Sequence, residues 1–270
     1  MSNWVEYAVK KQLSKRYARM AAAVIRLRNG IGGVLGLGQG APWVMSRYGV
    51  RMRANWRDRT FQYCYFATYG RFLADYLVRF DRDFAFLDIG ANQGLYSLLA
   101  VRNPRCHKAL ALEPVAATYA LLEANVAAND GASKTRCVQA ALADHCGEAQ
   151  ISVQNTHSGT ATLADRENFN PAHLQTILLI DIAALDALLP ATGNIVVKVD
   201  VEGYEAVVLA QLIKSQHVQR MVAVFYEVDT RWSDAGPLRN LLQQAGFNSF
   251  VRHGLGRHYD VLATRGPAAA

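Results

Sequence analysis

The segment FAFLDIGANQGLYSLLA, residues 84–100, constrains the fold of this chain more than any other. An apolar strand pattern ends there in an acid and passes at once into a glycine turn of the form DxGxNxG, before a helical pattern begins. Glycine lets backbone amides approach a ligand closely, and amides at a helix N-terminus attract anionic or polar groups. We therefore expect a turn that binds a nucleotide cofactor. Its predicted binding residues are Asp88, Gly90, Ala91, Asn92 and Gly94.

The first residue of this turn separates two classes of cofactor. A fold that binds NAD opens the turn with GxGxxG, because a pyrophosphate must lie against bare backbone. Asp88 stands where the first glycine would be. Its carboxylate would repel a pyrophosphate, but it would attract the sulfonium and α-ammonium groups of S-adenosylmethionine. The sequence therefore favours S-adenosylmethionine, and an NAD-dependent oxidoreductase or a non-catalytic cofactor-binding module are the alternatives.

The next apolar segment, HKALALEP over residues 107–114, ends in a second acid, Glu113. A carboxylate at this place can accept hydrogen bonds from two ribose hydroxyls, and Pro114 suits the first turn of a following helix. NAD enzymes carry an acid here too, and a helix cap is the structural alternative for Asp88 and Glu113 alike. We predict that Glu113 binds the ribose of the cofactor.

Strand and helix patterns alternate from residue 81 onward, which is typical of a mainly parallel sheet covered on both faces. The last two expected strands are separated only by a glycine-rich turn, so they must be antiparallel neighbours. By analogy with a known architecture, the seven-stranded Rossmann-like sheet, we predict a doubly wound, mainly parallel α/β fold with an antiparallel last strand. The expected strands are 84–88, 108–113, 135–141, 195–200, 222–228, 247–253 and 258–263.

Basic residues are concentrated at the start of the chain. Residues 1–60 hold twelve lysines and arginines against two acids, a net charge of +10, so the other 210 residues carry −3 of the total of +7. Large apolar residues recur there at three- and four-residue steps, which predicts a basic amphipathic helix. They are Val9, Leu13, Tyr17, Met20, Val24 and Leu27. Three roles stay open for this helix: docking on its own domain or a sister subunit, lying on an anionic membrane surface, or, least favoured, binding nucleic acid.

Composition and patterning divide the chain into four parts. Residues 1–47 are the helical extension with a glycine-rich connector, and 48–80 form an aromatic cap or hairpin region for which a packing role is equally open. Residues 81–265 are the catalytic domain, and 266–270 are a disordered tail. The four cysteines form no CxxC pair, so neither a zinc site nor a disulfide framework is indicated. We expect a cytoplasmic location, with peripheral membrane attachment left open.

A second polar segment, NIVVKVDVEGYEAVVLAQL over residues 194–212, places charge in a strand that should be buried on both faces. Lys198 lies inside this strand, and Asp200, two residues on, points to the same side. A buried lysine is rare unless it is paired, and a purely structural ion pair is the alternative to a catalytic one. The candidate partners near the carboxyl ends of the strands are Asp200, Glu202, Glu205 and Glu227.

Together these segments resemble the FkbM-type family of S-adenosylmethionine-dependent methyltransferases, which have a class I, Rossmann-like fold. The marks of that family are a strand ending in DxGANxG, an acid-Pro pair after the next strand, and a late KxDxEGxE block. They occur here, in order, at 88–94, 113–114 and 198–205, and the likeness covers roughly 48–265. The resemblance implies O-methylation of a sugar, glycan or polyketide-like acceptor. It also implies that the first turn holds the methionine part, Glu113 the ribose, and the stretch around Ala141 the adenine.

Methyl transfer to a hydroxyl requires an enzyme to hold the acceptor oxygen at attack distance while its proton leaves. A carboxylate within hydrogen-bond reach can take that proton, and Asp200 is the first candidate, Glu202 the second. Lys198 would orient the acid or stabilise charge on the oxygen, and Glu227 completes the predicted catalytic set. His253 is a third candidate base, with an ordinary rim histidine as the alternative. A divalent ion bridging Asp200 and Glu202 would do similar work, but oxygen ligands leave no reliable spacing, so no metal ligands are predicted.

The acceptor is the point at which the sequence says least. The segment 153–173 is long and polar and is well placed to cover an acceptor, so His157, Ser158 and Thr160 are predicted contacts. A surface loop without a role is equally consistent with this composition.

Overall fold

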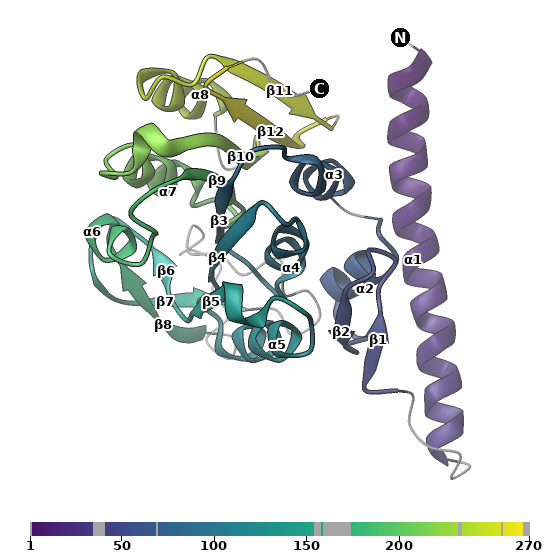
Figure 1. Ribbon diagram of the computed structural model, residues 1–270. Helices are drawn as coiled ribbons and strands as arrows, with labels where there is room; N and C mark the ends of the chain where they lie inside the picture. The colour runs from purple at the N-terminus through teal and green to yellow at the C-terminus, as the bar shows by residue number, and fades with distance from the viewer. Residues whose placement is uncertain are drawn as a thin grey trace.

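The computed structural model describes residues 2–34, 41–68, 70–153, 158, 174–231, 234–254 and 256–266 (Figure 1). The helices are α1 (Ser2–Val34), α2 (Arg59–Tyr65), α3 (Arg71–Arg79), α4 (Leu95–Arg102), α5 (Ala116–Ala127), α6 (Ile182–Asp186), α7 (Glu205–Leu212) and α8 (Ala235–Gln244). The strands are β1 (Trp43–Met45), β2 (Arg51–Arg53), β3 (Phe84–Ile89), β4 (Cys106–Leu112), β5 (Thr135–Val138), β6 (Ala141–Leu142), β7 (Gly147–Ser152), β8 (Leu174–Ile180), β9 (Asn194–Val199), β10 (Met221–Asp229), β11 (Ser249–His253) and β12 (His258–Thr264). The predicted contacts His157 and Thr160, and residues 267–270 of the tail, lie outside the described residues.

The central sheet has seven strands in the order β11-β12-β10-β9-β3-β4-β5. The pairs β10·β9, β9·β3, β3·β4 and β4·β5 are parallel. Strand β12 is antiparallel to both of its neighbours, β10 and β11. The prediction of a doubly wound, mainly parallel sheet with an antiparallel last strand is confirmed.

Helices cover both faces of this sheet, with α3, α4 and α5 on one side and α6, α7 and α8 on the other (Figure 1). Successive residues of a strand point to opposite faces, so Phe84 and Phe86 of β3 join the first core while Leu87 and Ile89 join the second. All six residues of β3 are buried, which is why the strand reads as a continuous apolar run. Asp88 interrupts that run and shares the face of Phe86.

A second, smaller sheet was not predicted from the sequence. It has the order β6-β8-β7, and β6 pairs with β8 in parallel. The prediction of one strand over 135–141 is wrong at its end, because the backbone turns after β5 and the amide of Ala140 donates to the carbonyl of Val138 at 3.0 Å. This turn carries Ala141 away from the central sheet and into the small one.

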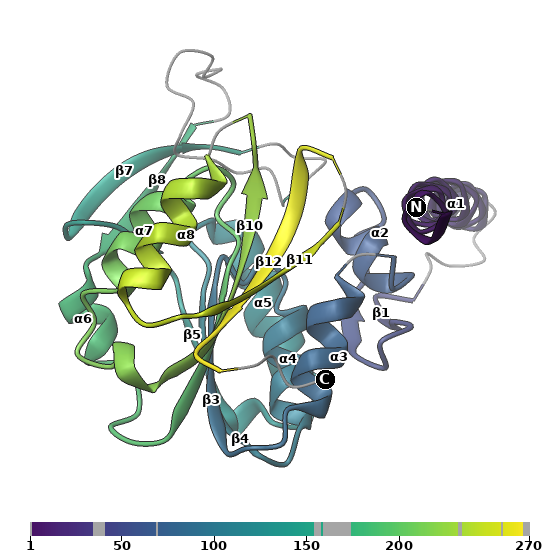
Figure 2. The ribbon, with the colours of Figure 1, turned by 90° about the horizontal axis from the view of Figure 1, so that it is seen from above.

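Helix α1 lies at one side of the molecule next to α2, as both ribbon views show (Figures 1 and 2). The glycine-rich connector was expected at residues 29–43, but residues 29–34 are helical. Strands β1 and β2 form an antiparallel hairpin before α2. Among the described residues, none of the helices combines the length and apolar character that crossing a bilayer requires. The division of the chain into four parts stays a prediction.

Candidate active site

A row of charged side chains lies at the carboxyl ends of the central strands, on the face covered by α4. Strand register places Asp88 of β3 directly beside Lys198 of β9. Lys198 Nζ lies 3.4 Å from Asp88 Oδ1 and 3.5 Å from Asp200 Oδ2, and both Lys198 and Asp88 are buried. Asp200 was one of four predicted partners of this lysine. Asp88 was not, because a pairing between neighbouring strands depends on a register that the sequence does not show.

Lys198 also holds the glycine turn. Its ammonium donates to the carbonyl oxygen of Gly90 at 2.5 Å. Gly90 has φ of +75°, and a Cβ there would lie 1.9 Å from the carbonyl oxygen of Asp200, so only glycine fits where the two strand ends meet. Burial lowers the pKa of Lys198, but the charges of Asp200 and Asp88 outweigh burial and the net shift is upward. Lys198 is therefore a charged group that joins the turn to the KxDxEGxE block.

The Asp88 side chain lies behind the turn and contacts α4. Its Oδ2 accepts a hydrogen bond of 2.7 Å from Ser97 Oγ on α4, and its side chain is fully buried. Gly94 has φ of +86°, and a Cβ there would lie 2.6 Å from Leu122 Cδ1. Asp88 and Gly94, both predicted to bind the cofactor, therefore shape the turn and its packing. Neither of them lines the cavity that the turn borders.

The other residues predicted to bind the cofactor, and the four predicted catalytic residues, line one cavity at the carboxyl edge of the sheet. On the turn side these are Gly90, Ala91, Asn92, Glu113 and Ala141. On the catalytic side they are Lys198, Asp200, Glu202 and Glu227. Segments that lie far apart in the sequence thus form the walls of a single space. The cavity continues to α1 and α2, where Lys15, Thr60, Tyr63 and Cys64 line it.

Glu113 is fixed by two backbone amides. Its Oε2 accepts from the amide of Asn92 at 2.9 Å, and its Oε1 accepts from the amide of Val115 at 3.0 Å. Burial raises the pKa of Glu113 to about 7, although both amide hydrogen bonds act in the opposite direction. Each carboxylate oxygen has a second lone pair, so two hydroxyl donors from a ligand can still be accommodated.

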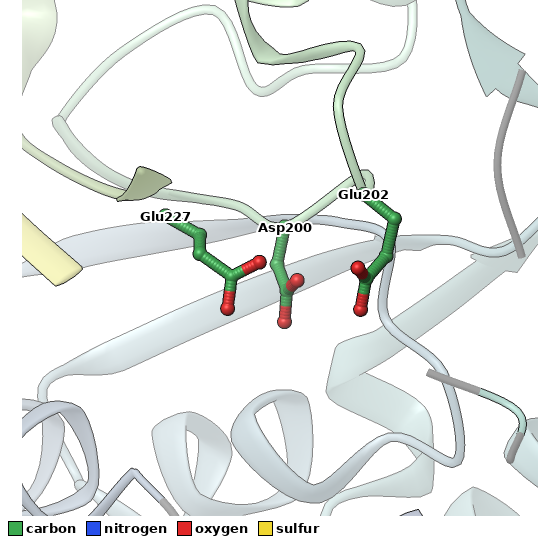
Figure 3. Close-up of side chains that lie close together, drawn as sticks. All are labelled: Asp200, Glu202 and Glu227. Atoms are coloured by element: carbon green, nitrogen blue, oxygen red, sulfur yellow. The ribbon is translucent and has the colours of Figure 1, made fainter. Parts of the chain in front are cut away.

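Three carboxyl groups converge on the opposite wall. Asp200, Glu202 and Glu227 point into the same space, and each offers an oxygen within 4.8 Å of the others (Figure 3). Burial and the surrounding acids raise the pKa of Glu202 to about 9, and burial with the charge of Asp200 raises that of Glu227. Glu202 adopts φ of +49°, a left-handed conformation that costs a non-glycine residue about 1 kcal/mol or more. The cluster can accept protons, bind hydroxyl groups or, by its donor atoms, coordinate a divalent cation.

The sequence did not single out His258, which connects this cluster to solvent. Its Nε2 lies 2.6 Å from Glu227 Oε1 and its Nδ1 lies 3.5 Å from Asp229 Oδ2. The side chain lines the cavity and is 44% exposed. The hydrogen bond with Glu227 raises the pKa of His258. Only the antiparallel pairing of β10 with β12 brings these residues together, so no local pattern could have indicated it.

The other histidine of this hairpin, His253, was the third candidate base. Its ring stacks on that of Phe72 with 3.3 Å between centroids, and it does not line the cavity. Burial lowers the pKa of His253. The geometry thus connects His258, and not His253, with the carboxyl cluster.

Asp58 joins the turn to the segment before it. Its Oδ1 accepts from the amide of Phe61, which caps α2, and from Gln93 Nε2 at 3.1 Å. Its Oδ2 accepts from the amide of Ser158 at 2.7 Å, and Ser158 Oγ donates to Asn92 Oδ1 at 3.1 Å. Ser158, a predicted acceptor contact, therefore lies at the cavity wall. The sequence signal for Asp58 is the capping pattern of an acid just before a helix, and it carries no information on the contacts with Gln93 and Ser158.

Comparison with known proteins gives a consistent result. Residues 88–249 match the family model described as "Methyltransferase FkbM domain", which is more than half of the chain. Methyltransferase sdnD of Sordaria araneosa is 35% identical over 81 residues, which are 30% of this chain and only 31% of that protein. The crystal structure of methyltransferase FkbM from Methylobacillus flagellatus KT superposes with a TM-score of 0.50 at 15% identity, over 77% of this chain and 53% of that one. The structural likeness supports the fold alone.

The two histidines of the β11–β12 hairpin test the geometry of the site by titration. In NMR titrations of the side chains we expect His258 to titrate above the ordinary histidine value of about 6.5 and His253 below it. Glu227→Gln removes the negative partner, so the pKa of His258 should fall while that of His253 stays unchanged. Equal titration of both histidines, or no response of His258 to Glu227→Gln, would contradict the pairing.

Proposed function

The chain belongs to the FkbM methyltransferase family, and from this premise we propose that it transfers a methyl group from S-adenosylmethionine to a hydroxyl oxygen of a sugar, glycan or polyketide-like acceptor. One observation carries the proposal: the carboxyl cluster of Asp200, Glu202 and Glu227 shares a cavity with the glycine turn and with Glu113. A cofactor-binding wall and a proton-accepting wall therefore face the same space.

The residues of the first wall fit S-adenosylmethionine. Glu113 retains lone pairs for two ribose hydroxyls, and Ala140, Ala141 and Leu142 provide small and apolar surface for an adenine ring. Gly90 lines the cavity, and its lack of a side chain lets the turn pack closely against the backbone of Asp200, which brings the turn and the acid together. When bound, S-adenosylmethionine supplies an electrophilic methyl carbon attached to a sulfonium.

The second wall takes the proton of the acceptor. A base must be ionised, and a carboxyl whose pKa is raised to about 9, as that of Glu202 is, carries its proton at neutral pH. Asp200 lies next to the Lys198 ammonium, and we assign it as the base that withdraws the hydroxyl proton. Lys198 holds this carboxylate in place beside the turn. Glu227 and His258 form a hydrogen-bonded pair along which the proton can leave toward solvent.

Other polar groups of the cavity lining support a hydroxylated acceptor. Thr60 and Tyr63 of α2 bring hydroxyl groups to the lining and Lys15 of α1 an ammonium, while the Ser158 hydroxyl lies beside Asn92 of the turn. Hydroxyl groups act as both donors and acceptors, so this lining suits a molecule with several hydroxyls. A sugar or an oxygenated polyketide-like compound has this character.

The cofactor can be tested by thermal unfolding. We expect S-adenosylhomocysteine to raise the melting temperature of the protein and NAD to leave it unchanged, because only a ligand of the native state shifts the unfolding equilibrium. At a concentration of 100 times Kd the stabilisation should be about 2.7 kcal/mol. A shift with NAD and none with S-adenosylhomocysteine would favour the alternative of a nicotinamide-dependent oxidoreductase.

The base can be tested by substitution. With methyl-labelled S-adenosylmethionine and a panel of sugars and hydroxylated polyketides, we expect Asp200→Asn to lose at least about 100-fold in methyl transfer. It should keep the thermal shift with S-adenosylhomocysteine, because Asp200 is assigned to the acceptor side. Asp144→Asn, an exposed aspartate outside the cavity lining, is the matched control. Wild-type turnover of Asp200→Asn would remove this residue from the mechanism.

A further inference from the structure

Helix α1 packs on the rest of the chain through its smallest side chains. Ala18 and Ala22 are fully buried, and together with Phe66 they form a small core to which Trp56 and Tyr65 contribute. Alanine surfaces allow close approach of a helix but cover little area. The packing therefore uses one narrow face of α1, with Ile25 and an edge contact of the Tyr17 ring with Phe66 at its margin, and it leaves most of the surface of the larger apolar side chains exposed.

The larger apolar side chains form a continuous exposed stripe on α1. They follow one another at steps of four and three residues, so they lie on one side of the helix. The exposed fractions are 57% for Leu13, 54% for Tyr17, 70% for Met20, 67% for Val24 and 66% for Leu27. Single exposed apolar residues are ordinary, but five consecutive ones along a helix mark an interaction surface. Figure 2, which views α1 along its axis, shows this helix beside α2 at the periphery of the molecule.

Arginines flank this stripe. At about 100° per residue, Arg16, Arg19 and Arg26 fall between the apolar stripe and the packed face, and all three are exposed. The sequence contains no aspartate or glutamate between Glu6 and Asp58. The exposed surface of α1 therefore combines a row of apolar side chains with a row of positive charge, and nothing in this stretch neutralises that charge.

The apolar stripe and the arginine row together distinguish between the possible partners of this surface. The spacing of the stripe would suit a coiled coil with a second copy, but that contact would bury the apolar stripe alone and leave Arg19 and Arg26, at positions away from the seam, without a partner. Nucleic acid would satisfy the arginines and leave five large apolar side chains in water. An anionic lipid surface satisfies both rows, because the apolar stripe enters the boundary of the acyl chains and the arginines meet the headgroups.

We propose that α1 docks this enzyme on anionic phospholipid membranes, with Leu13, Tyr17, Met20, Val24 and Leu27 inserted at the interface and Arg16, Arg19 and Arg26 at the headgroups. The same helix contributes Lys15 to the cavity lining. Membrane docking therefore acts on an element that borders the active site. The docking itself does not depend on the methyl-transfer proposal.

Vesicle flotation of the full chain tests this docking. We expect the protein to float with vesicles of phosphatidylcholine containing about 30% phosphatidylserine, and to float much less with phosphatidylcholine alone. Raising the salt from about 0.1 M to 1 M should weaken the binding, because the Debye length falls from about 10 Å to 3 Å. The double variant Met20→Ser with Val24→Ser, and the double variant Arg19→Glu with Arg26→Glu, should each lower vesicle binding by roughly tenfold or more.

A matched control uses exposed apolar residues elsewhere. Val78 and Leu178 are 57% and 52% exposed, and the double variant Val78→Ser with Leu178→Ser should bind vesicles as the wild type does. All of these positions are exposed, so the fold should persist, and an unchanged melting temperature verifies it. The shift caused by S-adenosylhomocysteine should also be unchanged, which separates a failure of docking from a failure of the proposed function.

Three outcomes would overturn the proposal. The first is equal flotation of the wild type and the Met20→Ser, Val24→Ser variant. The second is a dimer in sedimentation velocity that this variant dissociates while vesicles bind neither form, which would assign the stripe to a second copy. The third is tight binding of a short DNA or RNA duplex together with no binding to anionic vesicles.

Discussion

A single buried ammonium group holds the active site together. Lys198 lies between Asp88 and Asp200 and donates to the carbonyl of Gly90, so one cation touches the strand before the turn, the turn itself and the acid after the neighbouring strand. Removing the Lys198 ammonium and the Asp88 carboxylate from water costs several kcal/mol for each ion, and only close pairing with further hydrogen bonds offsets that cost. Ser97 supplies one such bond to Asp88. Burying these charges therefore costs folding stability. We explain their presence by the position that Lys198 gives to Asp200.

Different surroundings give the neighbouring carboxyl groups different pKa values. Burial raises the pKa of Glu113 to about 7 and that of Glu202 to about 9, while the hydrogen bond from Arg231 lowers the pKa of Asp229 to about 2. Carboxyl groups whose pKa values lie so far apart are typical of sites that move protons. In the proposed mechanism, a protonated Glu202 also limits the negative charge that gathers around the acceptor. Cofactor recognition, proton removal and proton exit would then occupy one small cavity.

Local sequence patterns predicted what depends on local structure. The apolar run that ends at Asp88 and the glycines after it indicated the place of the first strand and turn, and strand-helix alternation indicated a mainly parallel sheet. The seven-stranded form of the sheet was predicted by analogy with a known architecture. The pairings of Asp88 with Lys198 and of Glu227 with His258 were missed, because each depends on the register between strands distant in sequence. The small second sheet was missed for another reason. A tight turn at Ala140 breaks a run that reads as one strand, and no glycine or proline marks the break.

The replacement of Lys198 by methionine tests most directly whether this ammonium organises the site. Methionine has a similar length and no charge, so Asp88 would remain buried without its cation. We expect Lys198→Met to lower the free energy of unfolding in urea by about 3–5 kcal/mol and to weaken the binding of S-adenosylhomocysteine. Lys214→Met, at an exposed lysine, should change neither quantity. A Lys198→Met protein with wild-type stability and wild-type cofactor binding would contradict the account.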